Sequence, residues 1–155
     1  MKTIEWNKWQ RKAFQDLLRE FVAPIDAKAQ ERRQTGKTPK IPKYASCQNG
    51  LNKFLAPWGY ACKISLGSWD LSYKPSIAFC RQDILGEGFV NGKKECQKCL
   101  AYDKIIDPDG DAYYQESYDD LEVYLESITD YFLHLVNEFN QMPNVYFELE
   151  PSASH

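Results

Sequence analysis

Basic residues are missing from the last third of this chain. After Lys104 the sequence has no Lys or Arg, whereas it carries twelve Asp and Glu residues between 105 and 155. All 19 basic residues therefore lie in 1–104 together with 10 acidic ones, so the two parts carry net charges of +9 and −12 and the whole chain carries −3. Such a split within 155 residues indicates a charged partner, or two parts of one fold that complement each other.

Histidine is almost absent, which leaves little room for histidine-dependent catalysis. The two histidines are His134, inside an acidic segment, and His155. A Ser-His-Asp or Cys-His arrangement needs a base beside its nucleophile and a third group that orients the base. Only His134 could be that base, and no pattern in the sequence brings it near a nucleophile. We therefore expect no catalysis and no cofactor, and the remaining enzyme hypothesis is a small zinc-dependent one.

Long apolar runs are also missing, because no segment approaches the roughly 18 apolar residues of a membrane span. The first residues, MKTIEWNKWQRK, lack the apolar stretch of a signal peptide. Five cysteines are an odd number, and a chain of 155 residues can bury a core without disulfides. These absences predict a cytoplasmic protein without a membrane partner, folded as a single domain over 1–155.

The first 58 residues predict a basic helical part. Apolar residues recur at spacings of three and four between 4 and 22, which predicts an amphipathic helix. The expected buried stripe of this helix is Trp6, Trp9, Ala13, Leu17 and Phe21. Pro24 suits the first turn of a second short helix. A linker with three lysines follows at 34–43, and a third helix is expected over 44–56.

Residues 59–116 predict a strand-rich part. From Tyr60 to Leu66 apolar residues alternate with others, which indicates a half-buried strand. Further strands are expected at 76–80 and 100–106. A long glycine-broken surface loop separates these two strands.

Residues 117–150 predict an acidic helix and an edge strand. The helix is expected over 118–140, with Ser117 as its cap and apolar residues at helical spacing. Its expected buried stripe is Leu121, Leu125, Ile128, Phe132, Leu135 and Phe139. Apolar residues alternate in NVYFELE, which indicates the edge strand. Together the segments predict an α+β fold, with a small central antiparallel or mixed sheet flanked by N-terminal and C-terminal helices.

One side of the acidic helix repeats like charges. Glu122, Glu126 and Asp130 recur at i, i+4, a spacing at which like charges destabilise an isolated helix by roughly 0.2–0.5 kcal/mol per pair. We expect water and salt to screen this stripe. The alternative is that Lys and Arg of the N-terminal helices lie across it.

The cysteine spacing contains half of a metal site. Tetrahedral zinc needs two short Cys pairs, or one pair with two further ligands, and Cys96-x-x-Cys99 is the one pair in this chain. Cys62 lies on the apolar stripe of its strand, so we expect a small core residue there. We therefore predict no metal site, with Cys96 and Cys99 as the candidate pair if one exists.

The basic and aromatic residues of 1–104 are typical of a nucleic-acid surface. Lys and Arg contact phosphates whatever the sequence, while exposed aromatic rings stack on bases. Three lysines recur every third residue in the linker, which aligns them along one edge of a polyproline-like segment. The expected nucleic-acid-binding residues are Lys37, Lys40, Lys43, Lys63, Trp69, Tyr73 and Lys74. The alternatives are a solvated linker and buried aromatic side chains.

One motif carries a family resemblance. In YACKISLGSWDLSYKPSIAF a strand ends in Lys-apolar-Ser-apolar-Gly, an aromatic loop follows, and a proline leads the next strand. The positions that fit are Lys63, Ser65, Gly67, Trp69, Pro75, Ile77, Ala78 and Phe79. Over about 20 of 155 residues, this pattern resembles the N-terminal DNA-binding domains of McrB-type modification-dependent restriction systems, which flip a methylated base into an aromatic pocket. The aromatic position after the proline is Ser76 here, so the resemblance implies a DNA-facing module more than readout of one modified base.

Two functions remain in contention. The first is a DNA-binding specificity module of a bacterial restriction or defence system without catalysis of its own. The resemblance implies duplex DNA as its ligand, with or without a flipped, modified base, and an AAA+ motor or nuclease subunit as a candidate protein partner. The alternative is an acidic protein-binding module of the toxin-immunity or DNA-mimic type, whose carboxylates neutralise a basic protein partner.

Overall fold

The computed structural model describes residues 3–36, 45–65, 75–84, 97–101, 115–117, 120–138 and 144–150. The elements within these ranges, in chain order, are α1 (Lys8–Thr35), α2 (Ala45–Leu55), the 3-10 turn η1 (Ala56–Trp58), β1 (Tyr60–Ser65), β2 (Ser76–Arg81), the 3-10 turn η2 (Gln82–Ile84), β3 (Gln97–Ala101), β4 (Gln115–Ser117), α4 (Leu121–Glu138) and β5 (Asn144–Glu150).

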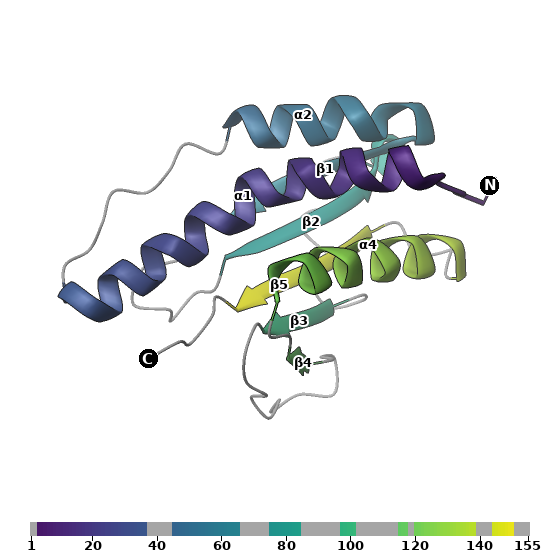
Figure 1. The fold of residues 1–155 in the computed structure, drawn as a ribbon. Coiled ribbons are helices and arrows are strands. Elements are labelled where there is room, and N and C mark those ends of the chain that lie inside the picture. Colours follow the sequence, from purple (N-terminus) through teal and green to yellow (C-terminus); the bar gives the residue numbers. More distant parts are fainter. Residues whose placement is uncertain are drawn as a thin grey trace.

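The strands form one mixed sheet in the order β1-β2-β5-β3-β4. β2 pairs antiparallel with β1 and with β5, whereas β3 pairs parallel with β5 and with β4. The helices α1, α2 and α4 form a layer against the sheet, with α4 lying beside the β5 side of α1 and α2 on its other side (Figure 1). The predicted α+β fold, with a mixed sheet flanked by N-terminal and C-terminal helices, is confirmed.

The core lies between the helix layer and the sheet. Phe132 of α4 is fully buried, and its ring centroid lies 4.6 Å from that of Phe79 on β2 and 5.4 Å from that of Phe14 on α1. Leu125 and Ile128 precede it on the same helix face and are also fully buried. These residues confirm the middle of the predicted stripe of α4 and show how one helix joins α1 to the sheet.

α1 runs unbroken through Pro24, so the prediction of two helices here is wrong. The helix starts with a reciprocal cap: the Gln10 N–H donates to Asn7 Oδ1 and the Asn7 N–H donates to Gln10 Oε1, both at 2.9 Å. Pro24 removes one helical hydrogen bond, to the carbonyl of Glu20.

The buried stripe of α1 differs from the predicted one. Phe14 and Leu18 are fully buried, whereas 71% of Trp9 is exposed. Trp6 is buried, but it lies in the segment before α1 begins. The predicted helical repeat was counted from Trp6, which lies outside the helix. Counted in this way, Trp9 falls on the buried face, whereas it is exposed.

β5 lies in the middle of the sheet, so the prediction of an edge strand at 144–150 is wrong. It pairs with β2 on one side and with β3 on the other. Alternating apolar residues occur in both central and edge strands, because the sequence of one strand does not show which strands pair with it. β3 begins three residues before the predicted start at Leu100, so part of the predicted surface loop is strand. β4, with three residues, was not predicted.

Both ends of α4 are held by side chains. The Glu122 N–H donates to Asp120 Oδ1 at 2.6 Å, so Asp120 caps the helix, whereas the predicted cap Ser117 belongs to β4. Near the other end, Asn137 accepts the Ile4 N–H at 2.7 Å and donates to the Ile4 carbonyl at 2.9 Å. This pair fixes the N-terminal segment to the last turn of α4.

Candidate nucleic-acid interface

Several described elements begin or end at one end of the sheet. β1 ends at Ser65, β2 begins with Ser76, and these two residues are in register. α2 begins at the same end, because the side chain of Gln48, in its first turn, accepts the Ile64 N–H at 2.8 Å. In the sequence, residues 66–74 connect β1 to β2 and residues 37–44 precede α2, and both segments lie outside the described residues. We call this end of the sheet the β1–β2 end.

Lys63 is the one predicted site residue within the described part of the chain. It is exposed on β1, and its neighbours Cys62 and Ile64 are buried on the opposite face of the strand. The alternation that predicted this strand therefore also predicted that Lys63 reaches solvent. The remaining predicted residues, Lys37, Lys40, Lys43, Trp69, Tyr73 and Lys74, lie outside the described residues.

The motif divides into core and surface positions. Ile77 and Phe79 are fully buried and belong to the central core. Lys63 and Ser65 are exposed. Packing in the core accounts for Ile77 and Phe79 without any ligand. Lys63 and Ser65 face solvent and are the members of the motif that a ligand can reach. Ser76, where the resembling family has an aromatic residue, is buried.

The acidic stripe of α4 is paired with α1, so the expectation that only water and salt screen it is wrong. Arg11 forms ion pairs with Glu126 and, at 2.6 Å, with Asp130. Arg19 approaches both carboxylate oxygens of Glu122, at 3.1 and 2.5 Å. The alternative prediction, basic residues of the N-terminal helices lying across the stripe, is the one that holds.

The pairing shifts the pKa of both partners. Burial alone would lower the pKa of Arg11, but its hydrogen bonds to Asp130 and Glu126 outweigh burial and raise it. Burial alone would raise the pKa of Glu126, but hydrogen bonds from Arg11 and Gln15 outweigh it and the pKa is lowered. The pKa of Asp16 is lowered by hydrogen bonds from Lys12 and Arg19. The charged forms of these carboxylates are thus favoured in the folded state.

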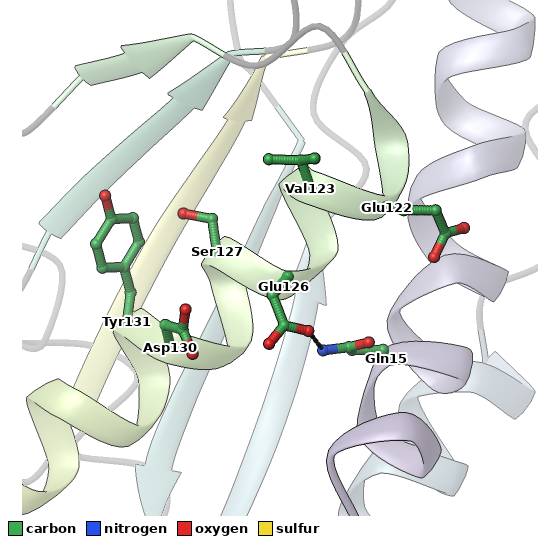
Figure 2. Close-up of a pocket in the computed structure, with 7 residues that line it drawn as sticks. All are labelled: Gln15, Glu122, Val123, Glu126, Ser127, Asp130 and Tyr131. Carbon is green, nitrogen blue, oxygen red and sulfur yellow. Dashed lines mark hydrogen bonds between the residues drawn. The ribbon is translucent and has the colours of Figure 1, made fainter. Parts of the chain in front are cut away.

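A shallow depression lies over this ion-pair network. It is about 570 Å³ in volume and is lined by Gln15, Glu122, Val123, Glu126, Ser127, Asp130 and Tyr131. Figure 2 shows Gln15 reaching from α1 to Glu126, with Val123 and Tyr131 along α4. The three carboxylates keep more than half of their side-chain surface exposed. This depression, which we call the α1–α4 groove, is unsuited to phosphates because its charged lining is acidic.

The described cysteines offer no ready metal ligands. Cys47, Cys62 and Cys80 are buried, which confirms the prediction that Cys62 is a core residue. Burial raises the pKa of the Cys47 thiol to about 11 and that of Cys62 to about 12, so both thiols are protonated near neutral pH. Among the described residues no three His, Cys, Asp or Glu side chains are grouped to hold an ion. Cys96 lies outside those residues, and the prediction for Cys96 and Cys99 stays a prediction.

Comparison with known proteins adds no relative. No family model matches the chain, and no similar protein was found among curated proteins or solved structures. In the part of the chain that the structure describes, no helix has the length and apolar character to cross a membrane. Function therefore has to be argued from the residues themselves.

Sequence reasoning missed two features near these surfaces. The alternative prediction named Lys and Arg of the N-terminal helices in general and did not single out Arg11. Arg11 and Arg19 are eight positions apart on α1, as are Glu122 and Asp130 on α4. This equal spacing is the sequence pattern that indicates the pairing. The exposed Trp9 was assigned to the core; 5.5 Å separates its ring from the Lys8 ammonium, a cation–π distance.

Proposed function

We propose that this chain is a DNA-binding specificity module of a bacterial restriction or defence system, without catalysis of its own. Its DNA contacts lie at the β1–β2 end, with Lys63 and Lys74 on phosphates and Trp69 with Tyr73 at a base or in a groove. The observation that carries the proposal is the division of the motif: its apolar members fill the core, whereas Lys63 and Ser65 are exposed. Packing explains only the apolar members, and the exposed Lys63 is accessible to a phosphate.

The charge distribution supports this assignment. Arg11 and Arg19 neutralise part of the acidic stripe of α4, so these carboxylates lie beside fixed positive charges. Three of the twelve carboxylates of 105–155 are therefore compensated within the chain, which weighs against the DNA-mimic alternative. The repulsion that DNA meets from the acidic part is smaller than its net charge of −12 suggests, because opposite charges only a few Å apart largely cancel at longer range.

DNA binding by the full chain tests the proposal. Fluorescence anisotropy with a labelled duplex, plain or cytosine-methylated, should detect binding at low salt. Lys63→Ala should weaken binding to all duplexes alike and reduce the slope of log K against log salt by about one unit. Lys53→Ala is the matched control, since Lys53 is an exposed lysine in the last turn of α2, away from the β1–β2 end.

A second variant separates base contacts from phosphate contacts. Trp69→Ala should leave the salt slope unchanged, cost roughly 1–3 kcal/mol of binding energy, and remove any preference for modified DNA. The proposal fails if the chain binds neither duplex nor single-stranded DNA at low salt. It also fails at Trp69 if Trp69→Ala unfolds the protein, since Trp69 would then be a core residue.

Protein binding at the α1–α4 groove is the second candidate function. It is favoured by Val123, which is 54% exposed between carboxylates and offers an apolar contact to a basic protein. Val123→Asp and the Glu126→Gln change would weaken capture of such a partner without affecting DNA. If a basic protein is captured from a host lysate and DNA is not bound, this candidate replaces the first.

A further inference from the structure

Two large apolar side chains on the helix layer point away from the sheet. They are Trp9 of α1 and Val123 of α4, and both are exposed. Trp9 lies nine residues before the buried Leu18, and Val123 lies nine residues before the buried Phe132. Nine residues are about 2.5 helical turns, so each exposed side chain lies opposite a core residue of its own helix. We call this side of the helix layer, which faces away from the sheet, the outer face.

The ion pairs between α1 and α4 run along the outer face. The two helices are antiparallel, because Arg11 meets Asp130 whereas Arg19 meets Glu122, eight residues earlier on α4. Eight residues of helix are about 12 Å long. The pairs and the α1–α4 groove therefore span about two turns of each helix.

The two exposed apolar side chains lie at opposite ends of this span. Trp9 is two residues before Arg11, at one end of the network, and Val123 follows Glu122 at the other end. Val123 also lines the groove between the helices (Figure 2). Tryptophan is usually well buried in a monomer and is enriched among the residues that carry most of the energy of protein interfaces. The outer face thus combines a groove with an apolar side chain near each end.

The groove presents carboxylates rather than guanidinium groups. Arg11 and Arg19 keep only 24% and 33% of their side-chain surface exposed, whereas the three carboxylates that they contact keep between 51% and 63%. The arginines lower the electrostatic potential at a distance but leave these carboxylates accessible. An approaching cation can therefore form a charge-assisted hydrogen bond with a carboxylate.

We infer that the outer face docks a basic amphipathic helix of a partner protein. Arginine or lysine side chains of this helix contact Glu126 and Asp130, and apolar side chains near its two ends contact Trp9 and Val123. The acidic groove selects a basic partner, and a helix places its cations at i, i+4, the spacing at which the carboxylates of α4 recur. The inference rests on the second candidate function, to which it adds Trp9 and the helical form of the partner.

Docking at the outer face is independent of DNA binding. Lys63 projects from the face of the sheet opposite to the helix layer, because its neighbours Cys62 and Ile64 point into the core beneath the helices. The two surfaces therefore lie on opposite sides of the sheet. Lys63→Ala should leave the docking of a helix unchanged, and Trp9→Ala should leave DNA binding unchanged.

A designed peptide tests the inference on the full chain. The probe is a fluorescein-labelled, alanine-based helix of about 18 residues, long enough to be helical in isolation. It carries arginines at i, i+4 and i+8 and a leucine near each end of the same face. The reference peptide has glutamine in place of each arginine. In anisotropy titrations at low salt, the arginine peptide should bind about tenfold more tightly than the glutamine peptide.

The apolar contacts are tested by two variants of the outer face. Trp9→Ala and Val123→Ser should each weaken binding of the arginine peptide about fivefold or more, as expected for residues that anchor an interface. The indole N–H signal of Trp9 in the NMR spectrum should shift when the peptide is added. Thermal unfolding checks that both variants keep the fold.

The carboxylate contacts are tested by a matched pair of variants. Asp130→Asn should weaken the arginine peptide about fivefold and make its binding less dependent on salt. Asp83→Asn is the control, because Asp83 is an exposed carboxylate that also pairs with an arginine, and Arg81 is as exposed as Arg11. Its binding should equal that of the wild type. Where Asp130→Asn does not fold, Glu126→Gln gives the same comparison.

The outcomes separate the inference from both candidate functions. If the arginine peptide binds no more tightly than the glutamine peptide, the inference is wrong, and capture of a basic protein by the groove would still support the second candidate. If Trp9→Ala and Val123→Ser bind the peptide as the wild type does, or if Asp83→Asn weakens it as much as Asp130→Asn, the inference is also wrong. DNA binding by the wild type and by Lys63→Ala is measured without peptide, so the first candidate stands or fails separately.

Discussion

At the scale of single residues, two tryptophans three positions apart have opposite environments. Trp6 lies in an aromatic cluster, with its ring centroid 4.8 Å from that of Phe14, 5.3 Å from Phe54 and 5.5 Å from Trp58. Its indole N–H is buried without a hydrogen-bond partner among the described residues. Trp9 is 71% exposed. The difference arises because Trp6 enters the core from the segment before the helix, where Asn137 holds the backbone of Ile4.

We expect these tryptophans to differ sharply in their effect on stability. Trp6→Ala should lower the free energy of unfolding by about 3–5 kcal/mol, because it leaves a cavity among these three rings and that of Phe132. Trp6→Phe should cost much less, since it keeps an aromatic ring and removes a buried donor that lacks an acceptor. Trp9→Ala should lie within about 0.5 kcal/mol of the wild type. Urea unfolding followed by circular dichroism measures all three; a large loss for Trp9→Ala would contradict this structure of α1.

At the scale of elements, the free edge of β1 is covered by side chains of α2. β1 is the first strand of the sheet and pairs only with β2 among the described strands. Its Cys62 N–H donates to the Asn52 side chain and its Ile64 N–H donates to the Gln48 side chain. Edge strands with free N–H groups can pair with other chains and aggregate. Two amides of one helix occupy these donors instead.

Removal of these two amides should open the edge. Gln48→Ala and Asn52→Ala each leave a partly buried N–H without its acceptor, which costs about 1–3 kcal/mol. The double variant should also scatter light at concentrations where the wild type stays clear, because β1 can then pair with a second chain. Asn49→Ala is the control, since Asn49 lies on the exposed face of α2. Equal stability of the double variant and this control would show that the edge needs no cover.

At the scale of the whole molecule, α1 and α4 divide the charge between them. Arg11 and Arg19 of the basic half meet Glu122, Glu126 and Asp130 of the acidic half, more than 100 positions later in the sequence. Because the pairs are half exposed, each contributes little stability on its own. Their larger effect is on the surface potential, since they reduce the acidity of the face that α4 presents.

This pairing makes stability depend on acid pH. The folded-state pKa of Glu126 is lowered, so its contribution is complete above its ordinary pKa of 4.5 and is lost as the pH falls through the lower folded value. Glu126→Gln should therefore be less stable than the wild type at pH 7, by up to about 1 kcal/mol. The difference should shrink below about pH 4. Melting temperatures across this range test it, with Glu20→Gln, an exposed carboxylate of α1, as control.

An unchanged or raised stability of Glu126→Gln would contradict this prediction. If Glu126→Gln is as stable as the wild type at every pH, or more stable, then water and salt screen the stripe in solution. The α1–α4 groove would then offer free carboxylates, and the protein-binding candidate would gain support. The Glu20 control separates a specific loss of the Arg11 pair from a general effect of removing one negative charge.

The sequence by itself determined features that depend on local periodicity. The helical spacing of Leu125, Ile128 and Phe132 placed α4 and its buried face, and period-two alternation placed β1, with Lys63 outward and Cys62 inward. These patterns arise because a helix repeats every 3.6 residues and a strand every two. In the candidate site, the same alternation predicted that Lys63 is exposed. It carries no information about what Lys63 contacts.

Only the tertiary structure decided features that depend on distant residues. β5 lies in the middle of the sheet because β2 and β3 pair with both of its sides, and alternation within 144–150 carries no information about those neighbours. Arg11 and Arg19 face the acidic stripe because α1 and α4 pack side by side, which brings together residues more than 100 positions apart. α1 continues through Pro24 although the proline removes one helical hydrogen bond. For β5 and for the two arginines the deciding interaction is nonlocal, so no pattern of neighbouring residues contains it.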